Sequence, residues 1–180
     1  MSATEILRKD HREIKRLEKV VSKCYQKLNA GSQIPFTDIE KITLVISEFL
    51  DSIHYSREEN SYFACVSSYE TLNKEIHTFL VEHEFGRRIA IKIAYHLKRW
   101  KNGEDAREPV ARFLRTYSIY LQDHLSKEDA FFDRAEKEVL SKEEEKEMFE
   151  QFQSIIAITS KIDEMIKVID YLENQLWFKD

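Results

Sequence analysis

The sequence predicts an all-α protein, an antiparallel up-down four-helix bundle with an additional C-terminal amphipathic helix. Three observations predict this fold class. The 180 residues include only three glycines and two prolines, which leaves few turns. Apolar residues recur at helical spacing along nearly the whole chain. Only short breaker-rich gaps interrupt them, and short connections make neighbouring helices antiparallel.

Three gaps separate the four predicted bundle helices. They read NAGSQIPF near residues 29–36, CVSSYE near 65–70 and KNGEDAREP near 101–109. We therefore expect helices at about 3–28, 37–65, 70–100 and 106–132. Pro35 and Pro109 fall near helix starts, where proline is tolerated. Gly86 lies inside the third helix and costs about 1 kcal/mol there relative to alanine, so close packing or a bend is the expected reason for it.

A fifth helix is predicted after the bundle, ending at about residue 177. Ser141 and Glu144 form a capping box that would start it. Apolar residues from Phe149 to Leu172 form one broad face, which must be buried. Two alternatives remain open for that face, packing along the bundle or against a second subunit in a homodimer. We assign residues 1–135 to the bundle and residues 136–180 to a C-terminal helical extension.

Composition argues against several classes of protein. The net charge is -5 and no Lys/Arg block occurs, which disfavours a nucleic-acid-binding surface. The N-terminus lacks the apolar core of a signal peptide, and no segment approaches the roughly 18 apolar residues of a membrane span. We expect a cytoplasmic protein without nucleic-acid or membrane partners. Antiparallel geometry would place Cys24 and Cys65 roughly 36 Å apart, so both are expected as free thiols.

One histidine from each predicted bundle helix falls at the same height. Residues on antiparallel neighbours are level when the midpoint of their numbers lies in the connecting gap, and this holds for all three successive histidine pairs. Two glutamates follow two of these histidines by four residues and so share their helix faces. A single inward histidine is more often a hydrogen-bonded core residue, but four with two carboxylates are costly to bury unless a metal satisfies them. The predicted metal ligands are His11, His54, Glu58, His83, His124 and Glu128.

These residues resemble the hemerythrin-like, or HHE cation-binding, family over about residues 3–135. The resemblance rests on four motifs in order: KDHREI, HYSREENSYF, EHEFGRR and DHLSKEDAFF. It implies a hemerythrin-type bundle around a non-haem di-iron centre with an oxo or hydroxo bridge. The four histidines would be terminal ligands, and Glu58 and Glu128 would be bridging carboxylates.

The ligand pattern is closest to that of the repair-of-iron-centres proteins, which are linked to nitrosative stress. Oxygen-carrying hemerythrins have a fifth histidine, one turn from another on the third helix, and an aspartate as one bridge. Here Phe79 and Arg87 lie one turn on either side of His83, and Glu128 is the second bridge. The resemblance therefore implies oxygen binding or other metal chemistry with a small ligand rather than dedicated oxygen carriage.

Alternatives to the iron ligand set concern the metal and the neighbouring residues. Imidazole and carboxylate also suit zinc, manganese or nickel, so zinc and manganese remain open. A ferritin-like site is disfavoured, since no glutamate lies three residues before any histidine. Tyr117 and Tyr120 could hydrogen-bond a ligand or carry a radical, or could simply pack in the core. Arg87 could pair with a bridging carboxylate or an anionic ligand, or could form an exposed salt bridge. His77 and His96 are expected at the surface or beside the ligands. Solvated charges are expected at three glutamates, which could substitute as ligands if a helix is rotated: Glu59, Glu82 and Glu84.

Three hypotheses for the function follow. The first is a non-haem di-iron protein that binds or reacts with O2, NO or peroxide in sensing, stress defence or iron handling. The second is an enzyme, either an iron donor for repair or a peroxidase-type catalyst. The third is an interaction module in which the metal only staples the bundle and the fifth helix serves a partner. No catalytic residue is assigned, because the sequence does not decide whether there is turnover.

Overall fold

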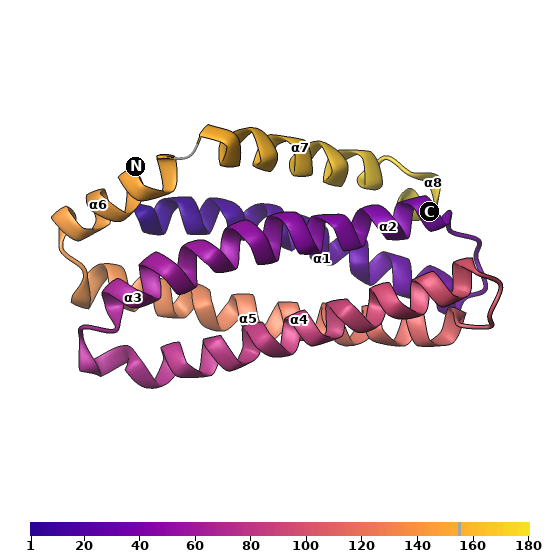
Figure 1. Cartoon of the computed structure of the whole chain (residues 1–180), viewed down its shortest axis with the longest axis horizontal. Coiled ribbons are helices and arrows are strands. Elements are labelled where there is room, and N and C mark those ends of the chain that lie inside the picture. The colour runs from indigo at the N-terminus through magenta and orange to yellow at the C-terminus, as the bar shows by residue number, and fades with distance from the viewer. Residues whose placement is uncertain (155) are drawn as a thin grey trace.

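The computed structural model describes residues 1–154 and 156–180, and within them it is helical without any strand. Long helices run antiparallel in a bundle, as predicted (Figure 1). The first, third and fourth bundle helices are α1 (Ala3–Asn29), α4 (Asn73–Lys101) and α5 (Arg107–Arg134). The second runs through α2 (Phe36–Val45), η1 (Ile46–Tyr55), η2 (Glu58–Tyr62) and α3 (Phe63–Val66). A 3₁₀ turn η3 (Glu70–Leu72) precedes α4, and a π turn η4 (Ala135–Val139) follows α5.

Local signals in the sequence account for where the helices begin and turn. Ser2 and Glu5 form a capping box at the start of α1. Gly31 and Gly103 adopt φ values of 87° and 94° in the turns before α2 and α5, a left-handed conformation that glycine adopts without steric cost. Pro35 is the N-cap residue of α2. The four predicted helix ranges agree with the structure to within a few residues.

The second bundle helix differs from a regular α-helix at the centre of the molecule. Both η1 and η2 are π-helical, with a wider turn than the α-helix. In an α-helix three consecutive residues cannot all face one side, because each is rotated by about 100° from the last. Here Ile53, His54 and Tyr55 are all buried. The π-helical stretch therefore places both His54 and Tyr55 in the interior.

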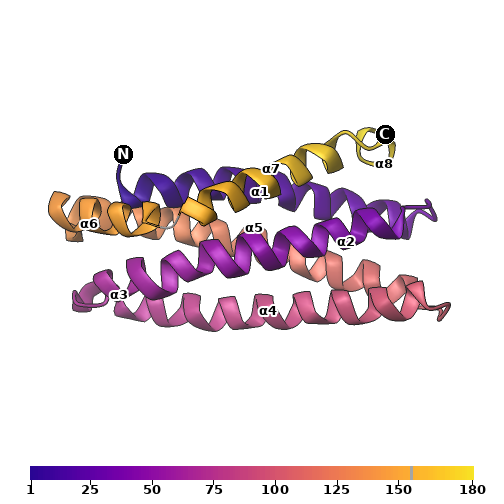
Figure 2. The same ribbon diagram turned by 45° about the horizontal axis from the view of Figure 1, so that its top comes forward.

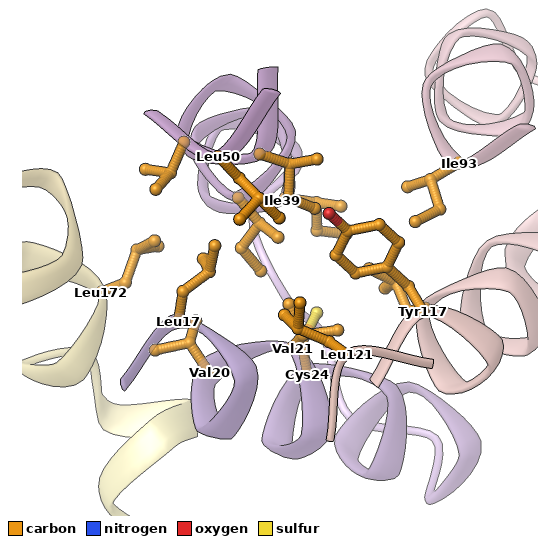
Figure 3. Packing of buried hydrophobic residues seen from close by; sticks show 14 of the residues in the cluster. Leu17, Val20, Val21, Cys24, Ile39, Leu50, Ile93, Tyr117, Leu121 and Leu172 are labelled. Carbon is orange, nitrogen blue, oxygen red and sulfur yellow. The ribbon is translucent and has the colours of Figure 1, made fainter. Parts of the chain in front are cut away.

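The apolar core lies on both sides of a polar centre. One cluster fills the end of the bundle that contains the α1–α2 turn and includes Leu17, Leu50 and Leu121 (Figure 3). The second cluster fills the opposite end and is rich in aromatic rings, such as Phe63 and Phe131. No residue of the predicted ligand set belongs to either cluster. The polar centre is thus enclosed by apolar packing above and below.

The C-terminal extension forms separate helices rather than the single fifth helix that the sequence predicts. They are α6 (Lys142–Gln153), α7 (Ile156–Glu173) and α8 (Leu176–Lys179). The predicted helix spans residue 155, and Ile155 lies outside the described residues. Phe152 of α6 packs into the aromatic cluster, whereas Met165, Ile169 and Leu172 of α7 pack into the other. The two segments thus cover different ends of the bundle, although their apolar periodicity continues from one to the next (Figure 1).

The apolar face of the extension is therefore used on its own bundle. In Figure 2, α7 lies across α1, and it also contacts α2 and η1. Arg16 of α1 forms ion pairs with Asp170 and Glu173 of α7. This packing is one of the two alternatives that the sequence leaves open, and a homodimer through this region stays a prediction.

Two further sequence expectations can be compared with the structure. Cys24 is buried, Cys65 is half-buried, and both are free thiols, as predicted. In the described part of the chain, no helix has the length and apolar character needed to cross a membrane.

Candidate metal centre

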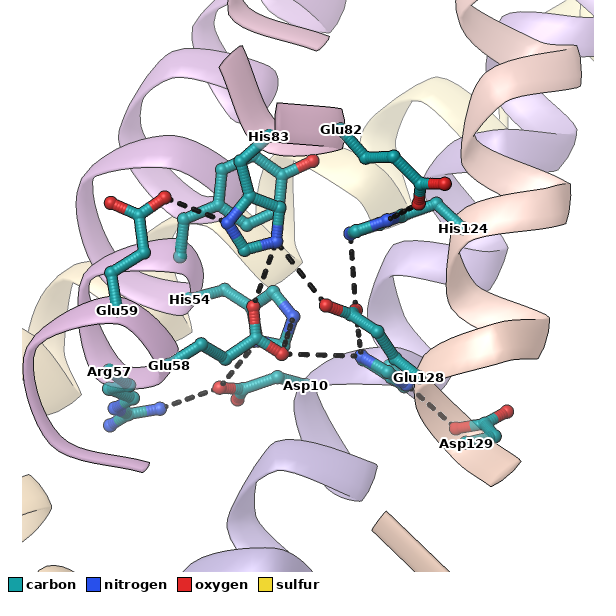
Figure 4. Close-up of polar contacts among 12 residues, drawn as sticks. Asp10, His54, Arg57, Glu58, Glu59, Glu82, His83, His124, Glu128 and Asp129 are labelled. Atoms are coloured by element: carbon teal, nitrogen blue, oxygen red, sulfur yellow. Dashed lines mark hydrogen bonds and ion pairs between the residues drawn. The ribbon is translucent and has the colours of Figure 1, made fainter. Parts of the chain in front are cut away.

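The six predicted ligand side chains meet at the centre of the bundle. Figure 4 labels His54, Glu58, His83, His124 and Glu128 there. They come from every bundle helix: His11 from α1, His54 and Glu58 from the π-helical stretch, His83 from α4, and His124 and Glu128 from α5. Each of the six is essentially inaccessible to solvent. The level arrangement expected from the gap positions therefore holds, and the structure brings together the whole predicted set.

Glu58 lies between the two pairs of histidines. One carboxylate oxygen, Oε1, is 3.2 Å from His54 Nε2 and 3.9 Å from His11 Nε2. The other oxygen, Oε2, is 3.4 Å from His83 Nε2. The two oxygens of Glu58 thus face different histidine pairs, which is the placement that a bridging carboxylate needs.

Glu128 occupies the equivalent position on the opposite helix. Its Oε1 lies 3.3 Å from His83 Nε2, and its Oε2 lies 3.2 Å from His124 Nε2 and 3.4 Å from His11 Nε2. Two groups of side chains could each hold a metal ion, and Glu128 belongs to both. The groups are His11, His54, Glu58 and Glu128, and then His83, His124 and Glu128.

Most inward-facing atoms of this set have no hydrogen-bond partner, and the exceptions are His83 Nε2 and Glu128 Oε1, which contact each other at 3.3 Å. The buried unpartnered atoms include Nε2 of His11, His54 and His124, both carboxylate oxygens of Glu58, and Oε2 of Glu128. A buried polar atom without a partner is costly, and these imidazole nitrogens and carboxylate oxygens are ordinary metal donors. The residues present therefore fit a bound cation.

The outward nitrogen of each ligand-set histidine faces a carboxylate. Nδ1 of His11 donates to Asp129 at 2.7 Å, Nδ1 of His83 to Glu59 at 2.7 Å and Nδ1 of His124 to Glu82 at 2.8 Å. His54 Nδ1 lies 3.5 Å from Asp10 Oδ2, an ion-pair distance that is too long for a strong hydrogen bond. A carboxylate on Nδ1 leaves the lone pair on Nε2 and orients the ring, as is typical of metal-bound histidine.

These outer carboxylates are the main feature that the sequence interpretation missed. The sequence predicts Glu59 and Glu82 as solvated charges, but each contacts a buried histidine. Asp10 and Asp129 are not among the site residues that the sequence predicts. The sequence contains one indication of these outer carboxylates, because each of the four acids is adjacent in sequence to a predicted ligand. It is weak, since each acid contacts a histidine on a different helix.

The negative charge of the centre changes the affinity of the histidines for protons. Burial lowers the pKa of His54, but Glu58 and Asp10 raise it more strongly, and the pKa rises to about 10. Burial likewise lowers the pKa of His83, while Glu128 and Glu59 raise it to about 9. A site that attracts protons this strongly also attracts a metal cation, and metal binding would release those protons.

Two tyrosines enclose the histidines on the side of α4. Tyr55 stacks on His83 with ring centroids 3.7 Å apart, and Tyr120 stacks on His124 at 5.2 Å. Their hydroxyl groups are hydrogen-bonded to each other at 2.7 Å. A Cβ atom at Gly86 would lie 2.6 Å from the Tyr120 ring, so close packing rather than a bend explains this glycine.

The other residues named from the sequence lie outside the ligand set. Tyr117 is buried next to Tyr120, with ring centroids 5.8 Å apart. Arg87 donates to Asp51 and Glu59, so it contacts neither Glu58 nor Glu128 and is not fully exposed. His77 and Glu84 are exposed, and His96 stacks on Phe113 away from the centre.

The comparison with protein families agrees with this geometry. The model of the hemerythrin HHE cation-binding domain matches residues 2–135, which is the bundle and all six side chains of the centre. Neither the curated proteins nor the solved structures include a significant match to the chain.

Proposed function

This chain belongs to the hemerythrin HHE cation-binding domain family, and we propose that its centre holds two metal ions. We further propose that the metal is iron and that it binds or reacts with a small ligand such as O2, NO or peroxide. The observation that carries the proposal is the set of buried, unpartnered nitrogen and oxygen atoms that face one another. A cation between them would remove the cost of burying them.

Each side chain of the centre has a definite task in this proposal. His11 and His54 would hold one ion, His83 and His124 the other, and the two glutamates would join them. Four imidazoles and two carboxylates do not complete the shells of two six-coordinate ions, so solvent or a small ligand has room to bind. Bound iron would supply reversible electron transfer at that open position. The outer carboxylates would hold the proton on Nδ1 and aim each Nε2 inward, so that Nε2 is the atom that gives up its proton when metal binds.

The surroundings of the centre favour a small ligand. A cleft of about 290 Å³ opens between η1 and α4, with Ile46, Ala90 and Ile91 among its apolar lining residues. Tyr55 also lines this cleft, and its ring stacks on His83 of the centre. A molecule in the cleft is therefore separated from the centre by one tyrosine, which excludes bulk water and large substrates.

Dedicated oxygen carriage is not part of this proposal. The two positions one turn from His83 hold Phe79, whose ring packs edge-on against His124, and Arg87, which is occupied by two carboxylates. Neither position can supply a further imidazole. Sensing, stress defence and iron handling are the roles we propose.

Metal analysis with anaerobic absorption spectra of the purified full chain tests the proposal. We expect about two iron ions per chain and a ligand-dependent charge-transfer band. His54→Ala and Glu58→Ala should each lose this stoichiometry, while His77→Ala, which changes an exposed histidine, should retain it. Full occupancy in both variants of the centre would defeat the assignment.

The same preparation separates the two other functional hypotheses. Multiple turnovers with peroxide or NO would establish an enzyme. Spectroscopically silent zinc, together with a melting temperature that falls on chelation, would establish a metal that only stabilises the bundle.

A further inference from the structure

Each carboxylate that faces a histidine Nδ1 is itself bound by a basic side chain. The donor–acceptor distances lie between 2.5 and 2.9 Å. The pairs are Lys15–Asp129, Arg57–Asp10, Arg87–Glu59 and Lys127–Glu82. A cation in this position holds the carboxylate ionised and oriented, so every histidine of the centre has an acid and a base behind it.

One of the four basic side chains is buried, and the other three are accessible to solvent. The side chain of Arg57 is 7% exposed, against 28% for Arg87, 43% for Lys127 and 51% for Lys15. Its partner Asp10 is also buried. An ion pair excluded from water is stronger than the same pair at the surface, but only for as long as it stays covered.

The C-terminal helix α6 supplies part of that cover. The Phe152 ring lies over the Arg57 guanidinium, with 5.3 Å between the ring centroid and Cζ, and Phe152 is buried. A cation over an aromatic face is attracted to it. Since the family match ends at residue 135, this contact comes from outside the domain that forms the centre.

Other contacts hold α6 in place independently of Arg57. Glu145 accepts hydrogen bonds from the backbone N–H of Thr4 at 3.0 Å and from the Thr4 hydroxyl. The Ser61 hydroxyl donates to Gln151 at 2.8 Å. These bonds attach α6 to the start of α1 and to η2, so docking of α6 decides whether Phe152 covers Arg57.

The buried pair also serves the histidine with the loosest outer contact. His54 Nδ1 is 3.5 Å from Asp10, whereas the other three histidines have carboxylates at 2.7–2.8 Å. Arg57 Nε has no hydrogen-bond partner, so the guanidinium depends on Asp10 and Phe152 for its position. If Phe152 no longer covered the Arg57–Asp10 pair, the orientation of the His54 ring would therefore be the first to loosen.

We propose that Arg57 is a positioning residue through which the docking of α6 sets how firmly His54 holds its metal ion. This inference rests on the proposed metal centre and adds its regulation. With α6 docked, Phe152 keeps Arg57 on Asp10, and Asp10 keeps the His54 ring oriented. With α6 undocked, water reaches the Arg57–Asp10 pair and the His54 ring is no longer fixed.

The rate of metal release from the full chain tests the proposal. The chain is loaded anaerobically with two equivalents of Fe²⁺ and mixed with an excess of a colorimetric Fe²⁺ chelator. Phe152→Ala and Arg57→Gln should each release one ion about tenfold faster and leave the other unchanged, and Arg57→Lys should restore part of the difference. Glu147→Ala changes an exposed residue on the same helix and leaves the packed face of α6 intact, so it should match the parent chain.

A metal-free measurement separates this inference from the metal centre itself. In spectra of ¹⁵N-histidine-labelled chain without metal, Phe152→Ala should shift the ring nitrogens of His54 and leave those of His124 in place. Unshifted His54 signals, or release from Glu147→Ala as fast as from Phe152→Ala, would overturn the proposal. A parent chain that binds fewer than two Fe²⁺ while His54 still shifts would overturn the proposed function alone.

Discussion

The two halves of the bundle carry the same short motifs and differ in what covers them. The first half, α1 with the second bundle helix, contains DHREIK at 10–15 and HYSREE at 54–59. The second half, α4 with α5, contains EHEFGR at 82–87 and HLSKED at 124–129. In each half one helix has an acid, a histidine and a base one turn later. The other has a histidine followed by a base, a glutamate and an acid.

The difference lies outside the motifs. The first half is π-helical at His54 and Glu58 and is covered by α6 and α7 (Figure 2). The second half is regular α-helix, and its outer face exposes Val81, Phe85 and Ile91 of α4. The same residue spacing thus delivers ligands from two helical geometries. In our proposal, docking of α6 controls how firmly His54 of the first half holds its metal ion, and the second half has no such covering helix.

The largest expected effect separates the two glutamates. Glu128 belongs to both groups of potential ligands, whereas Glu58 belongs to the group of the first half. Glu128→Ala should therefore lose both metal ions, and Glu58→Ala should retain about one ion per chain. Metal analysis after equilibrium dialysis measures this, with Glu84→Ala as a control at an exposed position of α4. If the two variants lose the same number of metal ions, Glu58 and Glu128 contribute equally to both metal sites.

The second prediction compares the covered face with the open one through the same substitution. Ile169 of α7 is fully buried on the first half, and Ile119 of α5 is 56% exposed on the second. Ile169→Ala should lower the free energy of unfolding by about 2–5 kcal/mol, because it removes buried methyl groups and leaves a cavity. Ile119→Ala should change it by no more than about 0.5 kcal/mol. Urea denaturation measures both, and similar losses would mean that α7 is not part of the folded core.

The third prediction concerns one position at which the motifs differ. Three residues after the motif histidine, the first half has the buried Ile14, whereas the second has Gly86, with Tyr120 occupying the space of a side chain. Gly86→Ala should destabilise the protein by about 1–3 kcal/mol through overpacking. The higher helix propensity of alanine should offset about 1 kcal/mol of that loss. Thermal unfolding measures the net effect. In a Tyr120→Leu background the loss should vanish, and an unchanged loss there would assign the cost to the backbone instead of to Tyr120.

The sequence predicts the inner part of the site well, because helices have a fixed rise and short connections set the register. The positions of His11, His54, His83 and His124 relative to the gaps are sufficient to place the four at one level. Their helical neighbours are sufficient to turn them inward. No contact between helices has to be known for this step.

The parts that the sequence did not predict depend on contacts between helices. The contact between Asp129 and His11 depends on how α5 is rotated against α1, and the sequence does not specify that rotation. Tyr55 stacks on His83 from the π-helical segment η1, and apolar spacing in the sequence does not distinguish a π-helix from an α-helix. The division between α6 and α7 is likewise invisible in an apolar pattern that continues across it.

The smallest expected effect tests whether α6 is an independent cover on the first half. Ser141 and Glu144 form a capping box at the start of α6, and Ser2 and Glu5 form one at the start of α1. Loss of either cap should cost about 1 kcal/mol, but α1 is part of the bundle core and α6 packs onto it from outside. Ser2→Ala should therefore lower global stability.

Ser141→Ala should mainly raise local opening of α6, because a helix that docks at the surface can open without unfolding the bundle. Amide hydrogen exchange should show lost protection in α6, with α4 and α5 unchanged. Loss of protection in both halves to the same extent would mean that α6 and the bundle unfold together. In that case α6 could not act as a separate control on Arg57, and the asymmetry between the halves would be one of packing alone.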